Sequence, residues 1–236
     1  MIDLHTHILP GFDDGVRSLE EARELAREAQ AEGVTAIAAT PHVRDDYPTS
    51  PERMERGVEA LRKDFATAGF DIEVVRGGEV ALERLWELPA DDVRRFTYGG
   101  AGRYLLVEFP YHGWPSLLEP TLADLRSHGI RALLAHPERN DAVQADPSRL
   151  ASAVRDGALV QITAASTAGL LGAEPLRAAQ HLIELGLVHV LATDTHGPGL
   201  AKRTSLATGV AALADAELAR RLATDVPAAI LAGVDV

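Results

Sequence analysis

The chain has 236 residues, of which 46% are hydrophobic and 25% are charged, a balance typical of a soluble globular protein with a sizeable core. The formal net charge of -12 argues against nucleic-acid binding, which needs a basic surface. Because the chain has no cysteine, disulfides, thiolate metal sites and the cysteine-based phosphatase mechanism are excluded. We find no signal peptide and no apolar run that could span a bilayer, so we expect a cytoplasmic protein without membrane insertion.

The N-terminal stretch combines a short apolar strand with several potential metal ligands. The predicted strand Met1–Leu4 is followed at once by His5 and His7, and a turn then leads to Asp13 and Asp14. Imidazole and carboxylate groups are good ligands for zinc, iron and manganese, and they are costly to bury without a partner. By itself this stretch fits either a metal site or an ordinary polar strand end. Adjacent aspartates point in different directions, so we expect one to bind metal and the other to orient the loop.

Predicted strands alternate with predicted helices along the chain. Ser18 with Glu21 forms a capping box that opens the first helix, and Pro51 suits the first position of the second helix. The strands are expected at residues 1–4, 34–39, 71–76, 103–107, 130–135, 159–162 and 187–192, and the helices at 18–31, 51–69, 81–88, 115–128, 147–156, 174–185 and over the last forty residues. This alternation is typical of a parallel sheet, either open or closed into a barrel. Since no repeat or linker interrupts it, we expect a single domain over residues 1–236.

Potential metal ligands follow six of the seven predicted strands. Only the sixth strand, near Gln161 and Thr163, lacks a histidine, aspartate or glutamate at its end. In parallel α/β folds the active site lies at the carboxyl ends of the strands, so these side chains should converge. The candidate ligands are His5, His7, Asp14, His42, Glu79, Glu108, His136, Asp194 and His196. Core packing does not explain this placement, and the sequence therefore predicts a metal centre.

Nine ligands exceed the three or four that one zinc ion needs and indicate two or three ions. Clustered divalent ions suit displacement at phosphorus, because one can activate water while others bind the phosphoryl oxygens. Arg139, three residues after His136, and the pair Lys202 and Arg203 are the best-placed cations for a substrate phosphate. Each of these cations fits a solvated surface position equally well. His112, in the loop after Glu108, is a further candidate for the wall of the site.

Several motifs resemble one known family in order and spacing. They are Asp3–Gly15, Thr40–His42, Gly78–Glu79, His136–Arg139 and the segment Gly186–His196. The chain resembles the polymerase and histidinol phosphatase (PHP) superfamily over nearly its whole length. It is most similar to the bacterial metal-dependent protein-tyrosine phosphatases of capsule and exopolysaccharide loci.

The resemblance implies an α/β fold, a distorted (β/α)7 TIM-like barrel, with a trinuclear site that holds manganese, iron or zinc. It implies three ligand sets: His5, His7, Glu79 and Asp194; Glu79, Glu108 and His136; and Asp14, His42 and His196. Glu79 would bridge the first two ions. Asp194, Arg139 and Arg203 are the implied catalytic residues, with Arg139 on the phosphate. The chain departs from the family in two places: it has Gly197 where the family often has Asn, and the loop Gly-Pro-Gly-Leu-Ala-Lys-Arg that starts there places the second arginine at Arg203 to within about a residue.

Hydrolysis of phosphotyrosine in a protein is therefore the leading hypothesis, with the tail of a bacterial tyrosine kinase as one candidate substrate. A small-molecule phosphatase of the histidinol-phosphate type could use the same metal ligands. The depth of the active-site opening would distinguish the two kinds of phosphatase. A metal-holding but inactive binding module conflicts with the complete ligand set and the arginine clamp. Hydrolysis of a C–N bond usually needs fewer ions. The sequence leaves the oligomeric state open.

Overall fold

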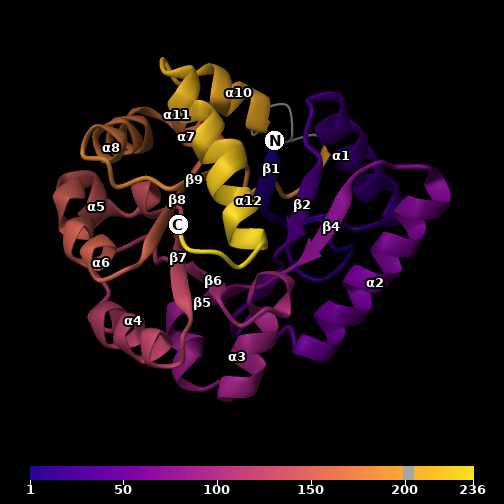
Figure 1. The fold of residues 1–236 in the computed structure, drawn as a ribbon, viewed down its shortest axis with the longest axis horizontal. Helices are drawn as coiled ribbons and strands as arrows, with labels where there is room; N and C mark the ends of the chain where they lie inside the picture. Colours follow the sequence, from indigo (N-terminus) through magenta and orange to yellow (C-terminus); the bar gives the residue numbers. More distant parts are fainter. Residues whose placement is uncertain (199–204) are drawn as a thin grey trace.

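The computed structural model describes residues 1–198 and 205–236, and in this part of the chain parallel strands lie at the centre of a ring of helices (Figure 1). The strands are β1 (Ile2–Thr6), β2 (Ala36–Ala39), β3 (His42–Val43), β4 (Glu73–Arg76), β5 (Glu79–Ala81), β6 (Tyr104–Glu108), β7 (Arg131–Ala135), β8 (Leu159–Thr163) and β9 (Val190–Ala192). They form a three-stranded sheet, β1-β2-β4, and a six-stranded sheet, β3-β5-β6-β7-β8-β9. Every pairing between these strands is parallel, which confirms the predicted parallel α/β class.

The two sheets are joined by short chain connections and by backbone hydrogen bonds. β2 leads into β3, and β4 leads into β5 across Gly77 and Gly78. At the other edge, the N–H of Asp194 donates to the carbonyl of His5, and the N–H of His7 donates to the carbonyl of Thr195, each at 2.9 Å. All seven predicted strands are present. The short strands β3 and β5 were not predicted, because two or three residues carry no periodic pattern.

Helices surround the strands. They are α1 (Leu19–Ala31), α2 (Pro51–Ala68), α3 (Ala90–Phe96), α4 (Leu118–Ser127), α5 (Asp141–Ala145), α6 (Ala151–Arg155), α7 (Ala164–Thr167), α8 (Ala173–Glu184), α10 (Leu206–Ala211), α11 (Ala216–Arg220) and α12 (Val226–Leu231). Helices α1 and α2 lie outside β2 and β4, α4 to α8 lie outside β6 to β8, and α12 crosses in front of the strands (Figure 1). The predicted helix at 81–88 is a 3-10 helix over Leu82–Trp86. Helix α3 was not predicted.

The sequence signals for the first two helices are confirmed. The Ser18 hydroxyl accepts a hydrogen bond from the Glu21 N–H at 3.3 Å and caps α1. The Glu21 carboxylate bonds to the Arg17 N–H at 2.7 Å, one residue before the position a standard capping box would use. Helix α2 ends at Gly69, whose φ of 76° lies in the left-handed region that glycine adopts without strain.

The apolar core has two clusters on opposite faces of the strands, a smaller one, called the inner cluster, and a larger one, called the outer cluster. Alternate residues of a strand point to opposite faces, so on β6 Leu106 joins the inner cluster and Leu105 joins the outer one. Val226 and Ile230 add α12 to the inner cluster. Within the described residues, no helix combines the length and apolar character that crossing a bilayer requires.

Candidate metal centre

All nine sequence-predicted ligands come together. In each of four overlapping groups, one potential ligand atom per residue lies within 4.8 Å of the others. The groups are His7, Asp14, His42 and His196; His5, Glu79 and His136; His5, His7 and Asp194; and His42, Glu79 and Glu108. Because His5, His7, His42 and Glu79 belong to more than one group, the cluster is continuous and could hold several ions that share ligands.

An irregularity in β1 accompanies the first two histidines. The pairing of β1 with β2 shifts register between Asp3 and Thr6, next to His5. Such bulges re-aim side chains beside functional sites. The Nε2 atoms of His5 and His7 then face one another at 3.3 Å, and each lies 3.2 Å from Oδ1 of Asp194.

Neighbouring polar groups orient both imidazoles. The Nδ1–H of His5 donates to Oε1 of Gln161 at 3.0 Å, and the Nδ1–H of His7 donates to Oδ2 of Asp13 at 2.8 Å. These bonds leave both Nε2 atoms free for metal, a common arrangement around ligating histidines. Gln161 belongs to the one predicted strand that lacked a ligand at its end. Its role was missed because an amide is a weak sequence signal for a metal site.

The two adjacent aspartates have different environments, as predicted. Asp13 accepts hydrogen bonds from the His7 ring, from the Gly15 N–H at 3.0 Å and from the His42 N–H at 2.9 Å. It therefore braces the loop. Oδ1 of Asp14 lies 3.5 Å from Nε2 of His42 and equally far from Nε2 of His196, so Asp14 is the aspartate that faces the cluster.

Glu79 lies at the centre of the cluster and is fully buried. Its Oε1 accepts a hydrogen bond from Nε2 of His136 at 3.0 Å. Its Oε2 lies 2.8 Å from Nδ1 of His42, 3.3 Å from Nε2 of His5 and 3.4 Å from Nε2 of His7. Glu79 begins β5 instead of following the strand before it. The turn at Gly77–Gly78 carries the chain from β4 into this new strand.

Two of the candidate ligands have unusual backbone conformations. Among the described residues, His136 and Asp194 are the only non-glycine residues with positive φ, at 39° and 55°. Conformations of this kind cost on the order of 1–3 kcal/mol each and cluster at functional sites. The strain at both strand ends turns these side chains toward the cluster.

Charge coupling shifts the pKa of several groups in the cluster. Burial alone would lower the pKa of His5, but the carboxylates of Glu79 and Asp194 outweigh it and raise that pKa to about 9. Burial also disfavours the protonated form of His7, but hydrogen bonds to Asp13 and the other carboxylates hold its pKa well above the usual range. Burial and the nearby Glu79 carboxylate raise the pKa of Glu108. Without metal, protons on imidazole balance the buried carboxylates.

The donor set fits divalent cations. Three buried atoms, Nδ1 of His42, Oε2 of Glu79 and Nδ1 of His136, lack a hydrogen bond of good geometry, although the first two are only 2.8 Å apart. Buried polar atoms normally find partners, so such atoms in a close group of acceptors mark a place for a cation. Nitrogen and carboxylate donors suit zinc, iron and manganese.

Arg139 borders the cluster as predicted. Its Nη1 donates to Oδ2 of Asp194 at 2.6 Å, while Oδ1 of the same carboxylate faces His5 and His7. One carboxylate can therefore face the cluster and hold the arginine. Arg203 and Lys202 lie outside the described residues. His112 is 90% exposed at its side chain and pairs with Asp141, and it lines a cleft together with the ligand candidate Glu108.

Glu138, next to Arg139, has a structural role that was not predicted. It is fully buried, and its Oε1 accepts hydrogen bonds from the Thr163 N–H, the Thr163 hydroxyl and the Ser166 hydroxyl at 2.7 to 2.9 Å. These bonds tie the loop after β7 to the start of α7. The loop that carries His136 and Arg139 is thereby fixed.

A family model described as "Capsular polysaccharide synthesis, CpsB/CapC" matches residues 1–232. The chain belongs to the CpsB/CapC family. It is 34% identical to the tyrosine-protein phosphatase YwqE of Bacillus subtilis (strain 168), with 83% of this chain and 77% of YwqE covered. It is 33% identical, at the same coverage, to the putative tyrosine-protein phosphatase CapC of Staphylococcus aureus. These matches confirm the resemblance to phosphatases of capsule loci.

A comparison with solved structures agrees with this family assignment. Over 100% of this chain, the fold matches a structure from a study of YwqE from Bacillus subtilis and CpsB from Streptococcus pneumoniae, described as metal-dependent tyrosine phosphatases. The TM-score is 0.84, the identity is 28% and 96% of that chain is covered. The lactonase Lmo2620 from Listeria monocytogenes, with a TM-score of 0.60 and 14% identity, shares the fold alone.

The raised histidine pKa values predict how the metal-stripped CpsB/CapC-family chain responds to pH. His5 has a folded pKa of about 9, above the value of about 6.5 expected when unfolded. Its contribution to stability is therefore complete below about pH 6.5 and is lost as the pH rises through about 9. His7 shifts in the same direction. We expect chelator-stripped protein to lose about 3 kcal/mol of unfolding free energy from His5 over this range.

Denaturant unfolding at several pH values measures this loss, and metal-loaded protein is the control. Metal requires neutral imidazole, so the loaded protein should show little of the same decline. If the stripped protein became more stable between pH 6.5 and 9, the two histidines would not carry protons in the folded state.

Proposed function

We propose that this chain is a metal-dependent phosphatase that hydrolyses phosphotyrosine in proteins, within a single domain over residues 1–236. The observation that carries the proposal is the convergence of nine histidine and carboxylate ligands in four overlapping groups. Relatives that cover most of the chain and are named tyrosine-protein phosphatases support the reaction type. The family description supports a place in capsular or exopolysaccharide synthesis, and the cytoplasm is the compartment we propose.

We propose three divalent ions of manganese, iron or zinc. The ligand sets are His5, His7, Glu79 and Asp194; Glu79, Glu108 and His136; and Asp14, His42 and His196. The placement of Glu79 between four imidazoles supports its role as a bridge. Bound divalent ions supply two things in this chemistry: they lower the pKa of water, and they withdraw charge from phosphoryl oxygens.

The protein's own residues position the phosphate. Arg139 presents a planar guanidinium, which can pair with two phosphoryl oxygens at once. Its Nη1 donates a hydrogen bond to Oδ2 of Asp194 at 2.6 Å. The Tyr111 ring packs against the guanidinium, whose central carbon lies 4.8 Å from the ring centroid. Arg139 is therefore preorganised, and such a donor stabilises charge that develops in the transition state. Arg203 remains the proposed second arginine.

Two further elements of the proposal concern the fold and the substrate. We propose that the two sheets form one distorted (β/α)7 barrel, supported by the bonds between β1 and the segment after β9 and by the inner apolar cluster. A cleft of about 480 Å³, lined by Glu108 and Tyr111 among others, opens beside the cluster. Because this cleft is open to solvent and not enclosed, it supports a tyrosine on a protein chain, such as a kinase tail, over a small ester in a closed pocket.

The experiment that tests the proposal compares two substrates on the same metal-loaded preparation. We expect kcat/KM for a phosphotyrosyl peptide to exceed that for histidinol phosphate by at least about tenfold. A chelator-treated sample gives the background. A preference for histidinol phosphate would contradict the protein substrate and favour a small-molecule phosphatase. If neither substrate were hydrolysed, the proposed phosphatase activity would be wrong.

A further inference from the structure

Two arginine–tyrosine–histidine stacks border the candidate metal centre. In the first, the Tyr111 ring lies parallel to the His136 ring, with centroids 5.6 Å apart and an interplanar angle of 1°. The Arg139 guanidinium lies 4.8 Å from the centroid of the same Tyr111 ring. Tyr111 is still 39% exposed, so part of it remains accessible to a ligand.

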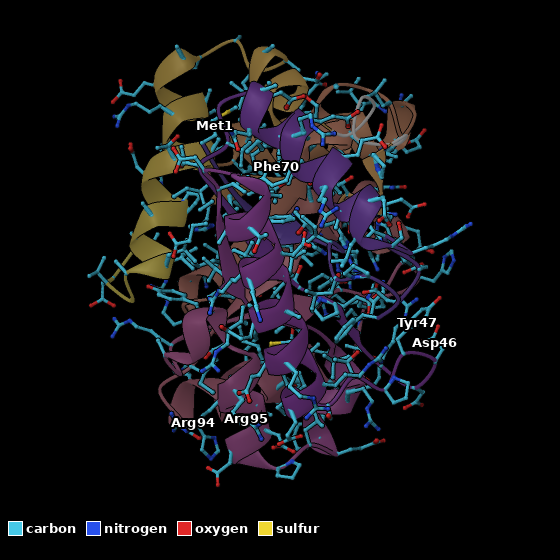
Figure 2. The ribbon with its side chains drawn as sticks, turned by 90° about the vertical axis from the view of Figure 1, so that its right-hand side faces the viewer. Met1, Asp46, Tyr47, Phe70, Arg94 and Arg95 are labelled. Atoms are coloured by element: carbon cyan, nitrogen blue, oxygen red, sulfur yellow. The ribbon has the colours of Figure 1, made fainter. Side chains whose placement is uncertain are left out.

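The second stack has the same composition and comes from the loop after β3. The Tyr47 ring lies 5.7 Å from the His42 ring at an interplanar angle of 16°, and the Arg44 guanidinium lies 5.2 Å from the Tyr47 centroid. Figure 2 shows Tyr47 beside Asp46 at the edge of the molecule, well away from Arg94 and Arg95. Each stack therefore contains one candidate ligand, His136 or His42.

The arginine of each stack is held by a carboxylate ligand. Arg139 donates to Asp194, and Arg44 donates through Nη1 to Oε1 of Glu108 at 2.8 Å. Arg44 also donates through Nε to Asp46 at 2.8 Å. Both guanidinium groups are thus fixed at the border of the metal cluster.

Arg44 and Tyr111 line one cleft. It has a volume of about 480 Å³, and Glu108 and Pro110 also line it. Arg44 reaches it from the loop after β3, and Tyr111 reaches it from the loop after β6. Glu108 connects the cleft to the cluster, because it belongs to one of the four ligand groups. A group attached to a phosphate on the cluster can therefore extend into this cleft.

We infer that Arg44 and Tyr111 bind the aromatic ring of an aryl phosphate in this cleft and so determine the specificity of the site for aryl over alkyl esters. The inference rests on the proposed phosphatase function and names two residues that set its substrate class. An exposed tyrosine ring stacks well on a second aromatic ring, and an arginine guanidinium is attracted to its face. Each contact is expected to contribute about threefold to tenfold in affinity.

A matched pair of non-hydrolysable ligands isolates this contribution. Benzylphosphonate and cyclohexylmethylphosphonate have similar size and the same anionic group, but only the first has an aromatic ring. Calorimetric binding to the metal-loaded protein gives both Kd values without any chemical step. We expect the wild-type chain to bind benzylphosphonate at least about fivefold more tightly.

Variants then assign the preference to the two residues. Tyr111→Leu and Arg44→Met should each reduce the benzyl preference about threefold to tenfold, whereas Tyr111→Phe should keep most of it because the ring remains. Arg23→Met removes a guanidinium that pairs with Asp64 on distant helices and serves as the control. Metal content is measured on every preparation, so that a loss of ions is not mistaken for a loss of ring binding.

The outcomes are distinct. If both phosphonates weaken equally in Tyr111→Leu, Tyr111 only supports Arg139 and His136, and the inference is wrong. Equal affinity for both ligands in the wild-type chain would also overturn it. Failure of the wild-type enzyme to hydrolyse phosphotyrosine would instead contradict the proposed function, whatever the phosphonate ratio.

Discussion

Replacing Glu79 with glutamine should lower phosphatase turnover by more than about a hundredfold. Glu79 is fully buried, and its two oxygens lie within 2.8 to 3.4 Å of nitrogens from His5, His7, His42 and His136. We propose that a carboxylate in this position would bridge two ions. Even groups that only orient a ligand are worth about 10- to 100-fold, so loss of a bridging charge should cost more.

Steady-state kinetics at saturating metal, with metal content measured on the same preparation, tests this expectation. Glu55→Gln is a suitable control, because Glu55 pairs with Arg76 and Arg95 on the outer surface. A Glu79→Gln enzyme that kept most of the wild-type turnover would show that Glu79 does not bridge two ions.

Replacing Arg139 with alanine should remove about 2–4 kcal/mol of transition-state stabilisation, the range typical of one preorganised donor. In the proposed role the planar guanidinium would pair with two phosphoryl oxygens, and Asp194 and Tyr111 fix its orientation. Arg139→Lys should recover only part of the loss, because an ammonium group restores the charge but not the paired donors. We expect the metal-loaded alanine variant to keep its ions and its melting temperature, because bound cations still neutralise Asp194.

Kinetics, melting and metal content on one metal-loaded preparation separate this role from a scaffold role. If Arg139 only steadies Asp194 and its loop, the alanine variant will melt earlier or lose metal. Its kcat/KM per intact site will then remain close to that of the wild type.

The sequence predicted the parallel α/β class and the meeting of nine ligands for one physical reason. Parallel strands all point the same way, so residues at the carboxyl ends of different strands, such as His5, Glu108 and His136, reach one edge of the sheet. The apolar pattern of the strands and the positions of the ligands along the chain are enough to predict this meeting, and the conformation of the loops is not needed. The helix ends at Ser18 and Gly69 were predicted from local residue types, which need no information about the fold.

Other features depend on contacts that are distant in the sequence. Strands β3 and β5 are too short for a periodic pattern, so Glu79 was expected after a strand and in fact begins one. The positive φ values of His136 and Asp194 have no local sequence signal, because neither residue is a glycine. The stacking of Arg139 on Tyr111 joins the loops after β7 and β6, whose conformation no local pattern indicates.

Metal content measured together with activity tests the central claim most directly. Chelator-stripped protein is titrated with manganese, and bound ions per chain and phosphotyrosyl-peptide hydrolysis are recorded at each step. The proposed site predicts two to three ions per chain at saturation, with activity that returns as the later ions bind. Binding of at most one ion per chain, or full turnover in the stripped protein, would contradict it.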